Sequence, residues 1–69
     1  MARLSYAETY TELLKYVSEK YNYPMHDIII CFRKTGVEEK FSQLFSINSD
    51  ANISAYYNYL KEYIKYAIS

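Results

Sequence analysis

Hydrophobic residues recur with a helical period at both ends of the chain, most clearly in the C-terminal segment. Spacings of four, three, four and three positions separate Ile53, Tyr57, Leu60, Ile64 and Ala67. Such spacing forms one apolar stripe along an α-helix. It predicts a helix over residues 52–68, with Ser49 or Asp50 as its N-cap. The rest of the chain is expected to pack against this stripe.

A second amphipathic helix is predicted over residues 5–21. Ser5 and Glu8 have the spacing of a capping box, which satisfies the free N–H groups at a helix start. One face then carries Tyr6, Tyr10, Leu13, Leu14, Val17 and Tyr21. The pattern stops before Pro24, because the residue before a proline avoids the helical conformation. Tyr16 lies off this apolar face, so we expect it to be exposed.

The middle of the chain predicts a β-hairpin. Residues 27–33 contain a short apolar run rich in β-branched side chains, which is typical of a buried strand. Gly36 can adopt the positive φ that a hairpin loop requires. Residues 37–47 then form a second strand, whose apolar side carries Val37, Phe41, Phe45 and Ile47. The two strands would share one apolar face.

This interpretation gives a small α+β domain of the order α-β-β-α, in which two amphipathic helices flank a two-stranded antiparallel hairpin. With only 69 residues, 1–69 is expected to be a single domain. Two strands alone make a marginal sheet. Their exposed edges would favour pairing with a second copy.

A helical interpretation of the middle segment competes with the hairpin. Val37, Phe41, Leu44 and Phe45 match one face of a helix. Thr35 and Glu38 also have capping-box spacing. If residues 37–47 are helical, the run 28–32 loses its strand partner and becomes helical too. The alternative fold is therefore an all-α protein of four helices, similar in outline to a helix-turn-helix domain.

Composition narrows the function classes. Eight Lys and Arg balance eight Asp and Glu, whereas a dedicated nucleic-acid binder usually carries a net basic patch. A core of this size supports only a few kcal/mol of stability, and a net charge of zero favours association. We therefore expect a homodimer.

The chain is expected to be cytoplasmic. Its single cysteine cannot form an internal disulfide. No apolar segment has the length of a signal peptide or a membrane span, so no membrane is expected as a partner. Richness in isoleucine, lysine, asparagine and tyrosine is typical of a low-GC genome, including that of a phage or another mobile element.

Catalytic and metal-binding patterns are not found, and we expect a non-enzymatic protein without cofactors. His26 is the only histidine, and Cys31 is the only cysteine and lies in the apolar run. They offer too few ligands for a metal site. Gly36 is the only glycine, so a phosphate-binding glycine loop is excluded. Glu38 and Glu39 would point to opposite faces of a strand.

Tyrosine is the one unusual component. Five of the ten tyrosines lie between Tyr6 and Tyr23 and five between Tyr56 and Tyr66. On the C-terminal helix, one side of the apolar stripe carries Tyr56, Tyr59, Tyr63 and Tyr66, which we call the tyrosine flank. Such rings can simply border a core with their hydroxyls in water. They can also form a recognition surface, because tyrosine supplies large, rigid contact area.

Two functions of different classes fit these observations. The first is a protein-binding module, acting as an adaptor, inhibitor or accessory factor (viral accessory proteins included) through the tyrosine flank. The second is a DNA-binding transcriptional regulator, because residues 41–47 (FSQLFSI) followed by Ile53-Ser54 resemble the paired helices of Cro and repressor domains. The pattern departs from that family at Ser46, where a turn glycine is usual, and in its longer turn. The predicted recognition helix also lacks an arginine for guanine edges.

Overall fold

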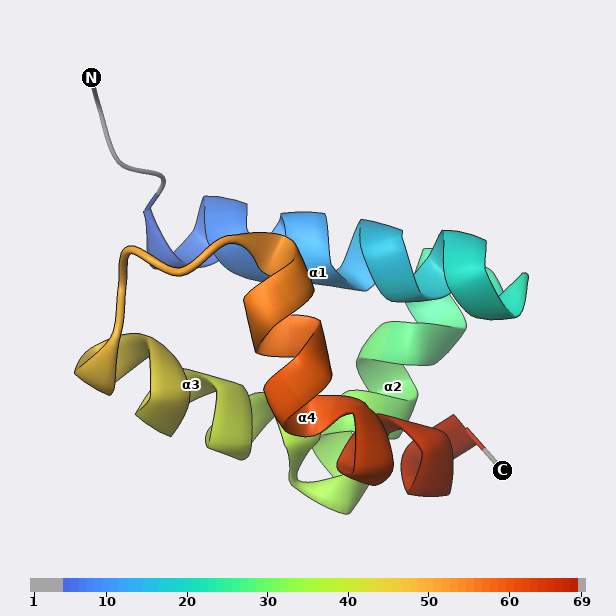
Figure 1. Ribbon diagram of the computed structural model, residues 1–69. Coiled ribbons are helices and arrows are strands. Elements are labelled where there is room, and N and C mark those ends of the chain that lie inside the picture. Colours follow the sequence, from blue (N-terminus) through green and yellow to red (C-terminus); the bar gives the residue numbers. More distant parts are fainter. Residues whose placement is uncertain (1–4, 69) are drawn as a thin grey trace.

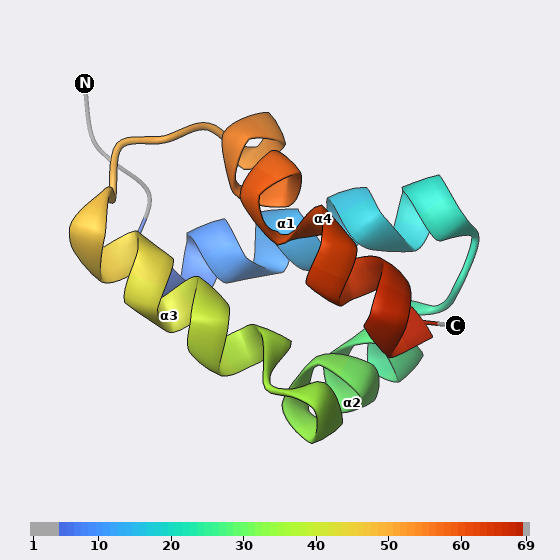
Figure 2. The same cartoon turned by 60° about the horizontal axis from the view of Figure 1, so that its bottom comes forward.

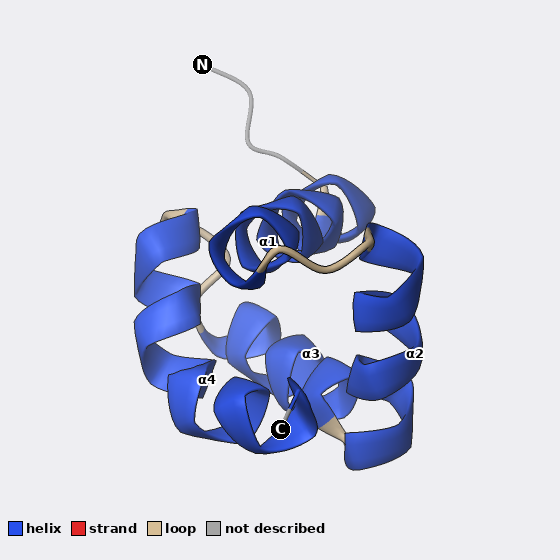
Figure 3. Cartoon of the chain, turned by 90° about the vertical axis from the view of Figure 1, so that its right-hand side faces the viewer, coloured by secondary structure: helices blue, strands red, loops and turns tan. Residues whose placement is uncertain are grey.

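The computed structural model describes residues 5–68, which form four α-helices (Figure 1). These are α1 (Tyr6–Tyr21), α2 (Met25–Thr35), α3 (Val37–Ile47) and α4 (Ile53–Ile68). Viewed from the side, α1 lies across one end, with α2 and α4 on opposite sides below it and α3 between them (Figure 3). Every pair of these helices is in contact. The four helices therefore enclose one shared core.

The predicted hairpin is wrong. No residue from 5 to 68 lies in a strand, so the domain is a small all-helical bundle and not an α+β fold. The predicted strands 27–33 and 37–47 fall within α2 and α3 instead. Without these strands, two copies cannot pair through hairpin edges, as the sequence analysis had expected. The four-helix alternative describes these segments correctly.

Only one face of α2 is buried, which explains why its isoleucine run is helical. Ile28 and Phe32, one turn apart, are buried, whereas Ile29 is half-buried and Ile30 is exposed. The preference of β-branched residues for strands depends on burial against neighbours, and here three helices offer a surface for a single stripe. The charged residues of α2 also favour a helix. Asp27 lies in the first turn and Arg33 and Lys34 lie in the last, where each sign of charge is stabilised by the helix dipole.

Gly36 separates α2 from α3. It has the positive φ expected of it, 81°, but it ends a helix in the left-handed conformation and does not form a hairpin loop. Its carbonyl accepts a hydrogen bond from the Lys40 N–H at 3.1 Å, so α3 starts directly after it. The Thr35 hydroxyl donates to the Cys31 carbonyl at 2.7 Å and does not cap α3. One flexible residue thus turns the chain between two helices (Figure 2).

The first and last helices, α1 and α4, confirm the helices that the spacing of apolar residues predicted. The Ser5 N–H donates to Glu8 Oε1 at 2.9 Å, and the Glu8 N–H donates to Ser5 Oγ at 3.2 Å, which completes the predicted capping box. At the start of α4, Asn52 Oδ1 accepts from the Ala55 N–H at 2.9 Å. This capping contact comes from Asn52 and not from the Ser49 or Asp50 that we expected.

Phe41 is the centre of an aromatic cluster that joins the helices. Its fully buried ring lies with centroids 5.4 Å from Tyr6 and 5.3 Å from Tyr10, both on α1. It also meets the Tyr56 ring of α4 edge-on at 5.3 Å. Tyr10 in turn contacts Phe32 of α2 at 6.4 Å. All four helices are linked by these ring contacts.

We expect Phe41→Ala to lower the free energy of unfolding by about 3–5 kcal/mol, because it removes the central ring and leaves a cavity. A domain this small has little more than that to lose. Urea denaturation in dilute solution, followed by far-ultraviolet circular dichroism, measures the change. Tyr59→Ala, which removes an exposed ring of similar size, should change stability by about 0.5 kcal/mol or less. Equal midpoints for the two variants would contradict the central role of Phe41.

Candidate functional site

Three of the four tyrosines of the predicted flank are exposed on α4. Tyr59 and Tyr66 expose 71% and 79% of their surface, and Tyr63 exposes 48%. Because they are spaced by four and three positions, they lie along one side of the helix. Large rings this open to water are unusual for residues that only border a core. They are the first part of the candidate site.

Tyr56 does not belong to this surface, which corrects its assignment to the exposed flank. Its exposed fraction is 0%, and its ring lies against Phe41 and Phe45. Its hydroxyl donates to the Asn48 carbonyl at 2.5 Å and so fastens the connection that leads into α4. Tyr56 is buried because α4 contacts all three other helices. The buried side of α4 is therefore wider than the predicted stripe of five apolar residues.

Ile47 is an exposed apolar residue that the sequence interpretation misplaced. The hairpin put it on the buried side of a strand, but it is 83% exposed near the end of α3. The helical period of α3 was the signal that could have found it. Val37 and Phe41 are buried and Leu44 is half-buried, and Ile47 lies beyond this stripe.

A groove of about 210 Å³ between α3 and α4 brings these side chains together. It is lined by Lys40, Gln43, Leu44, Ile47, Tyr59, Leu60 and Tyr63. The ammonium group of Lys40 lies 4.4 Å from the centroid of the Tyr63 ring, a cation–π contact. Leu44, Ile47, Tyr59, Tyr63 and Tyr66 together are called the α3–α4 face below. The apolar centre and polar edge of this face resemble the anatomy of a protein interface.

Charged groups lie at the edge of the α3–α4 face. Lys40 lies beside Tyr63 on the α3 side, and Glu62, three positions after Tyr59 and four before Tyr66, is exposed on the opposite side of these tyrosines. The Glu62 carboxylate pairs with the Lys65 ammonium group at 3.7 Å. Both side chains are largely exposed, so this pair contributes little to stability. The edge thus carries charges of both signs.

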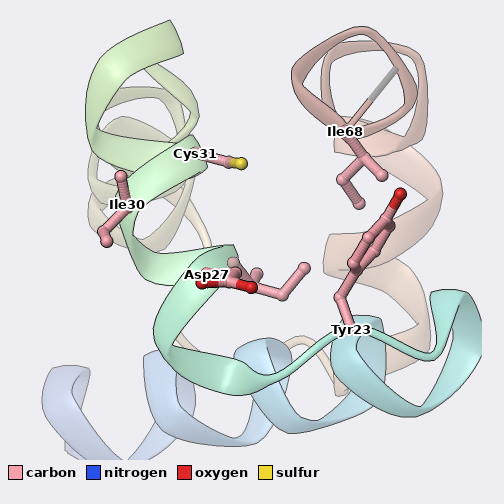
Figure 4. Close-up of a pocket in the computed structure, with 6 residues that line it drawn as sticks. Tyr23, Asp27, Ile30, Cys31 and Ile68 are labelled. Carbon is pink, nitrogen blue, oxygen red and sulfur yellow. The ribbon is translucent and has the colours of Figure 1, made fainter.

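A second pocket, of about 270 Å³, lies between α2, the end of α4 and the α1–α2 connection (Figure 4). It is lined by Tyr23, Asp27, Ile28, Ile30, Cys31 and Ile68. The Cys31 thiol and the Tyr23 ring point into the space beside Ile68. His26 is exposed and does not line it, so the pocket does not bring together the thiol and a basic imidazole. Its volume is slightly below that of ordinary small-molecule sites, about 300 Å³ or more.

The remaining tyrosines of α4 and α1 serve the packing. The Tyr57 and Tyr21 hydroxyls share a hydrogen bond of 2.9 Å. Tyr16 packs its ring 5.2 Å from that of Tyr57 and is half-buried, although its position had predicted exposure. Burial raises the pKa of the Tyr57 phenol, and the hydrogen bond with Tyr21 raises it further.

Tyr10 is held between α1 and α3 with its hydroxyl buried. Burial raises the pKa of the Tyr10 phenol, and the nearby negative charge of Glu38 adds to this effect. The hydroxyl oxygen makes no hydrogen bond of normal geometry among the described residues, so the carboxylate acts mainly through its charge. Burial also raises the pKa of Tyr56. Three core phenols therefore resist ionisation.

We expect alkaline pH to unfold the protein through these three phenols. Unfolded tyrosines lose their protons at a pH of about 10, whereas the raised folded pKa values keep Tyr10, Tyr56 and Tyr57 protonated. Their contribution to stability is complete below pH of about 10 and falls as the pH rises further. Near-ultraviolet absorbance of tyrosinate should show that Tyr10, Tyr56 and Tyr57 ionise only together with the loss of helical circular dichroism, as the last step of the titration. Ionisation of all ten in one step with the helices intact would contradict this expectation.

The segments that resemble a helix-turn-helix are consecutive helices. Residues 41–47 belong to α3, and Ile53 begins α4. The connection 48–52 is longer than the three or four residues usual in that motif.

Comparison with protein-family models, curated proteins and solved structures finds no significant match. Within residues 5–68, no three His, Cys, Asp or Glu side chains gather closely enough to hold a metal ion. None of the described helices combines the length and apolar character that crossing a bilayer requires.

Proposed function

We propose that this protein is a small protein-binding module of the cytoplasm, an adaptor, inhibitor or accessory factor that acts by docking and not by catalysis. Its docking surface is the α3–α4 face. The observation that carries the proposal is the gathering of Ile47, Tyr59 and Tyr63 along one groove, with Tyr66 on the same side of α4.

Ile47, Tyr59 and Tyr66 expose most of their side-chain surface to water. Apolar and aromatic surface is excluded from the core here, although burying it would be favourable by about 25 cal/mol per Å². Contiguous exposed patches of this kind mark interaction sites. Tyrosine suits such a site because its ring loses few rotamers on binding and its hydroxyl remains compatible with water.

DNA binding by α3 and α4 is the competing function. It rests on the resemblance of residues 41–47 and 53–54 to repressor helices. The chain has no net charge, and phosphate neutralisation normally supplies most of the affinity for DNA. The outward side of α4 is also occupied by Tyr59 and Tyr66. These observations favour a protein partner.

Affinity capture from the native host tests the proposal with three baits: wild type, Tyr59→Ala/Tyr66→Ala, and Tyr23→Ala as the control. Tyr23 is an exposed tyrosine outside the α3–α4 face, in the other pocket. We expect the double variant to lose its bound protein at least about tenfold, which corresponds to about 1.4 kcal/mol, while the control binds as wild type does.

Equal retention by all three baits would contradict the proposal, as would a loss specific to Tyr23→Ala. A DNA-binding regulator would instead be retained on DNA at low salt and released steeply as salt rises. All three baits should first show the same helical circular dichroism spectrum.

A further inference from the structure

We propose that the pocket between α2, the end of α4 and the α1–α2 connection is a binding site for a small aromatic amine. It shares no described lining residue with the α3–α4 groove, so it is a second site that does not depend on the proposed docking function. Three observations carry the inference: the volume of the pocket, the apolar side chains of its wall, and the single carboxylate at its edge.

The volume of the pocket suits one aromatic ring with a short side chain. A protein cavity of about 150 Å³ holds benzene, and this pocket measures about 270 Å³. The difference leaves room for a short chain that ends in a polar group. A drug-sized ligand usually needs a larger site. The pocket therefore matches a compound of about nine non-hydrogen atoms.

Apolar and aromatic side chains form most of the pocket wall. Tyr23 and Ile68 line one side, and the thiol of half-buried Cys31 points toward them from α2 (Figure 4). Sulfur groups and tyrosine rings both make favourable contacts with an aromatic ligand. Because Tyr23 is exposed, a ring bound beside it would remove apolar surface from water.

Asp27 sets the charge preference of the pocket. The described residues that line it include this one carboxylate and no basic side chain. Within residues 5–68 the carboxylate has no hydrogen bond or ion pair of its own. It lies across the pocket from the Tyr23 ring (Figure 4). An ammonium group held between them is attracted both by the carboxylate and by the face of the ring.

The backbone around the pocket also favours a cation. The N–H groups of Asp27 and Ile28, in the first turn of α2, both donate to the Pro24 carbonyl, at 3.1 and 3.2 Å. They are therefore not free to bind a carboxylate or phosphate, as N–H groups at a helix start often do. Ile68 lies in the last turn of α4, where the peptide dipoles create a partial negative charge.

Titrations followed by proton–nitrogen correlation NMR test the site with three phenyl compounds that differ in charge: 2-phenylethylamine, 2-phenylethanol and 3-phenylpropionate. The amine should shift the signals of Tyr23, Asp27 and Cys31 with a dissociation constant of about 1 mM or below. The alcohol should bind about tenfold more weakly, because it lacks the positive charge, and the propionate more weakly still. Signals of Ile47 and Tyr59, in the α3–α4 groove, should not shift.

Asp27→Asn removes the charge and keeps the shape of the side chain. In this variant the preference for the amine over the alcohol should fall to about threefold or less, the part that the Tyr23 ring supplies. Glu39→Gln is the matched control, because it removes an exposed carboxylate from the first turn of the next helix, α3. It should keep the wild-type preference. Cys31→Leu places a larger side chain in the pocket and should weaken the binding of all three compounds.

Three results would each overturn the inference: no shift of the pocket signals by the amine up to about 10 mM, an alcohol that binds as tightly as the amine, or a preference for the amine that Asp27→Asn leaves unchanged. Unweakened binding to a folded Cys31→Leu would overturn it as well. Each variant should first show the wild-type circular dichroism spectrum, and if Cys31→Leu does not, Asp27→Asn decides alone. These readouts concern this pocket only, so the affinity capture through Tyr59 and Tyr66 tests the proposed function separately.

Discussion

The packing of aromatic rings around Phe41 is the contact on which the other features of this fold depend. One buried ring from α3 touches rings from α1 and α4, and Tyr10 carries the network on to Phe32 of α2. Aromatic pairs add about 0.5–1.5 kcal/mol each beyond the area they bury. In a domain of this size, several such pairs are a large part of the net stability. Helices α2 and α3, with 11 residues each, are too short to be stable in isolation.

The tyrosines divide into two groups according to what surrounds each hydroxyl. Tyr56 and Tyr57 are buried, yet each hydroxyl has a partner, in the Asn48 carbonyl and the Tyr21 hydroxyl respectively. Tyr59 and Tyr66 are mainly exposed. A phenol tolerates both situations, because it combines an apolar ring with one polar atom. The same residue type can therefore build the core and cover the surface of a single helix.

The proposed docking surface follows from how α4 is packed. Its inner side is taken up by three other helices, so only its outer side remains for another molecule. The end of α3 extends that surface with Ile47. Binding there would not disturb Phe41 or Tyr56, which lie on the inner side of the same helices. Under the proposed function, the contacts that stabilise the fold and the surface that binds a partner lie on opposite sides of α3 and α4.

The sequence by itself determined the two longer helices, because their signals are local. The capping box of Ser5 and Glu8 and the stripe through Leu60 and Ile64 need no distant partner to be recognised. It also indicated three of the exposed tyrosines, because a residue far from the apolar stripe of a helix faces water. The helical alternative for residues 37–47 was visible in the spacing of Val37, Phe41 and Leu44.

Only the tertiary structure decided the secondary structure of residues 27–47 and which side chains belong to the α3–α4 face. A short run such as 28–32 fits a buried strand or a partly buried helix equally well, and contact with three helices selects the helix. Tyr56 is buried because α3 covers its side of α4, and Ile47 is exposed because α3 is a helix. Both outcomes depend on neighbours distant in sequence, which no local pattern of hydrophobic and polar positions encodes.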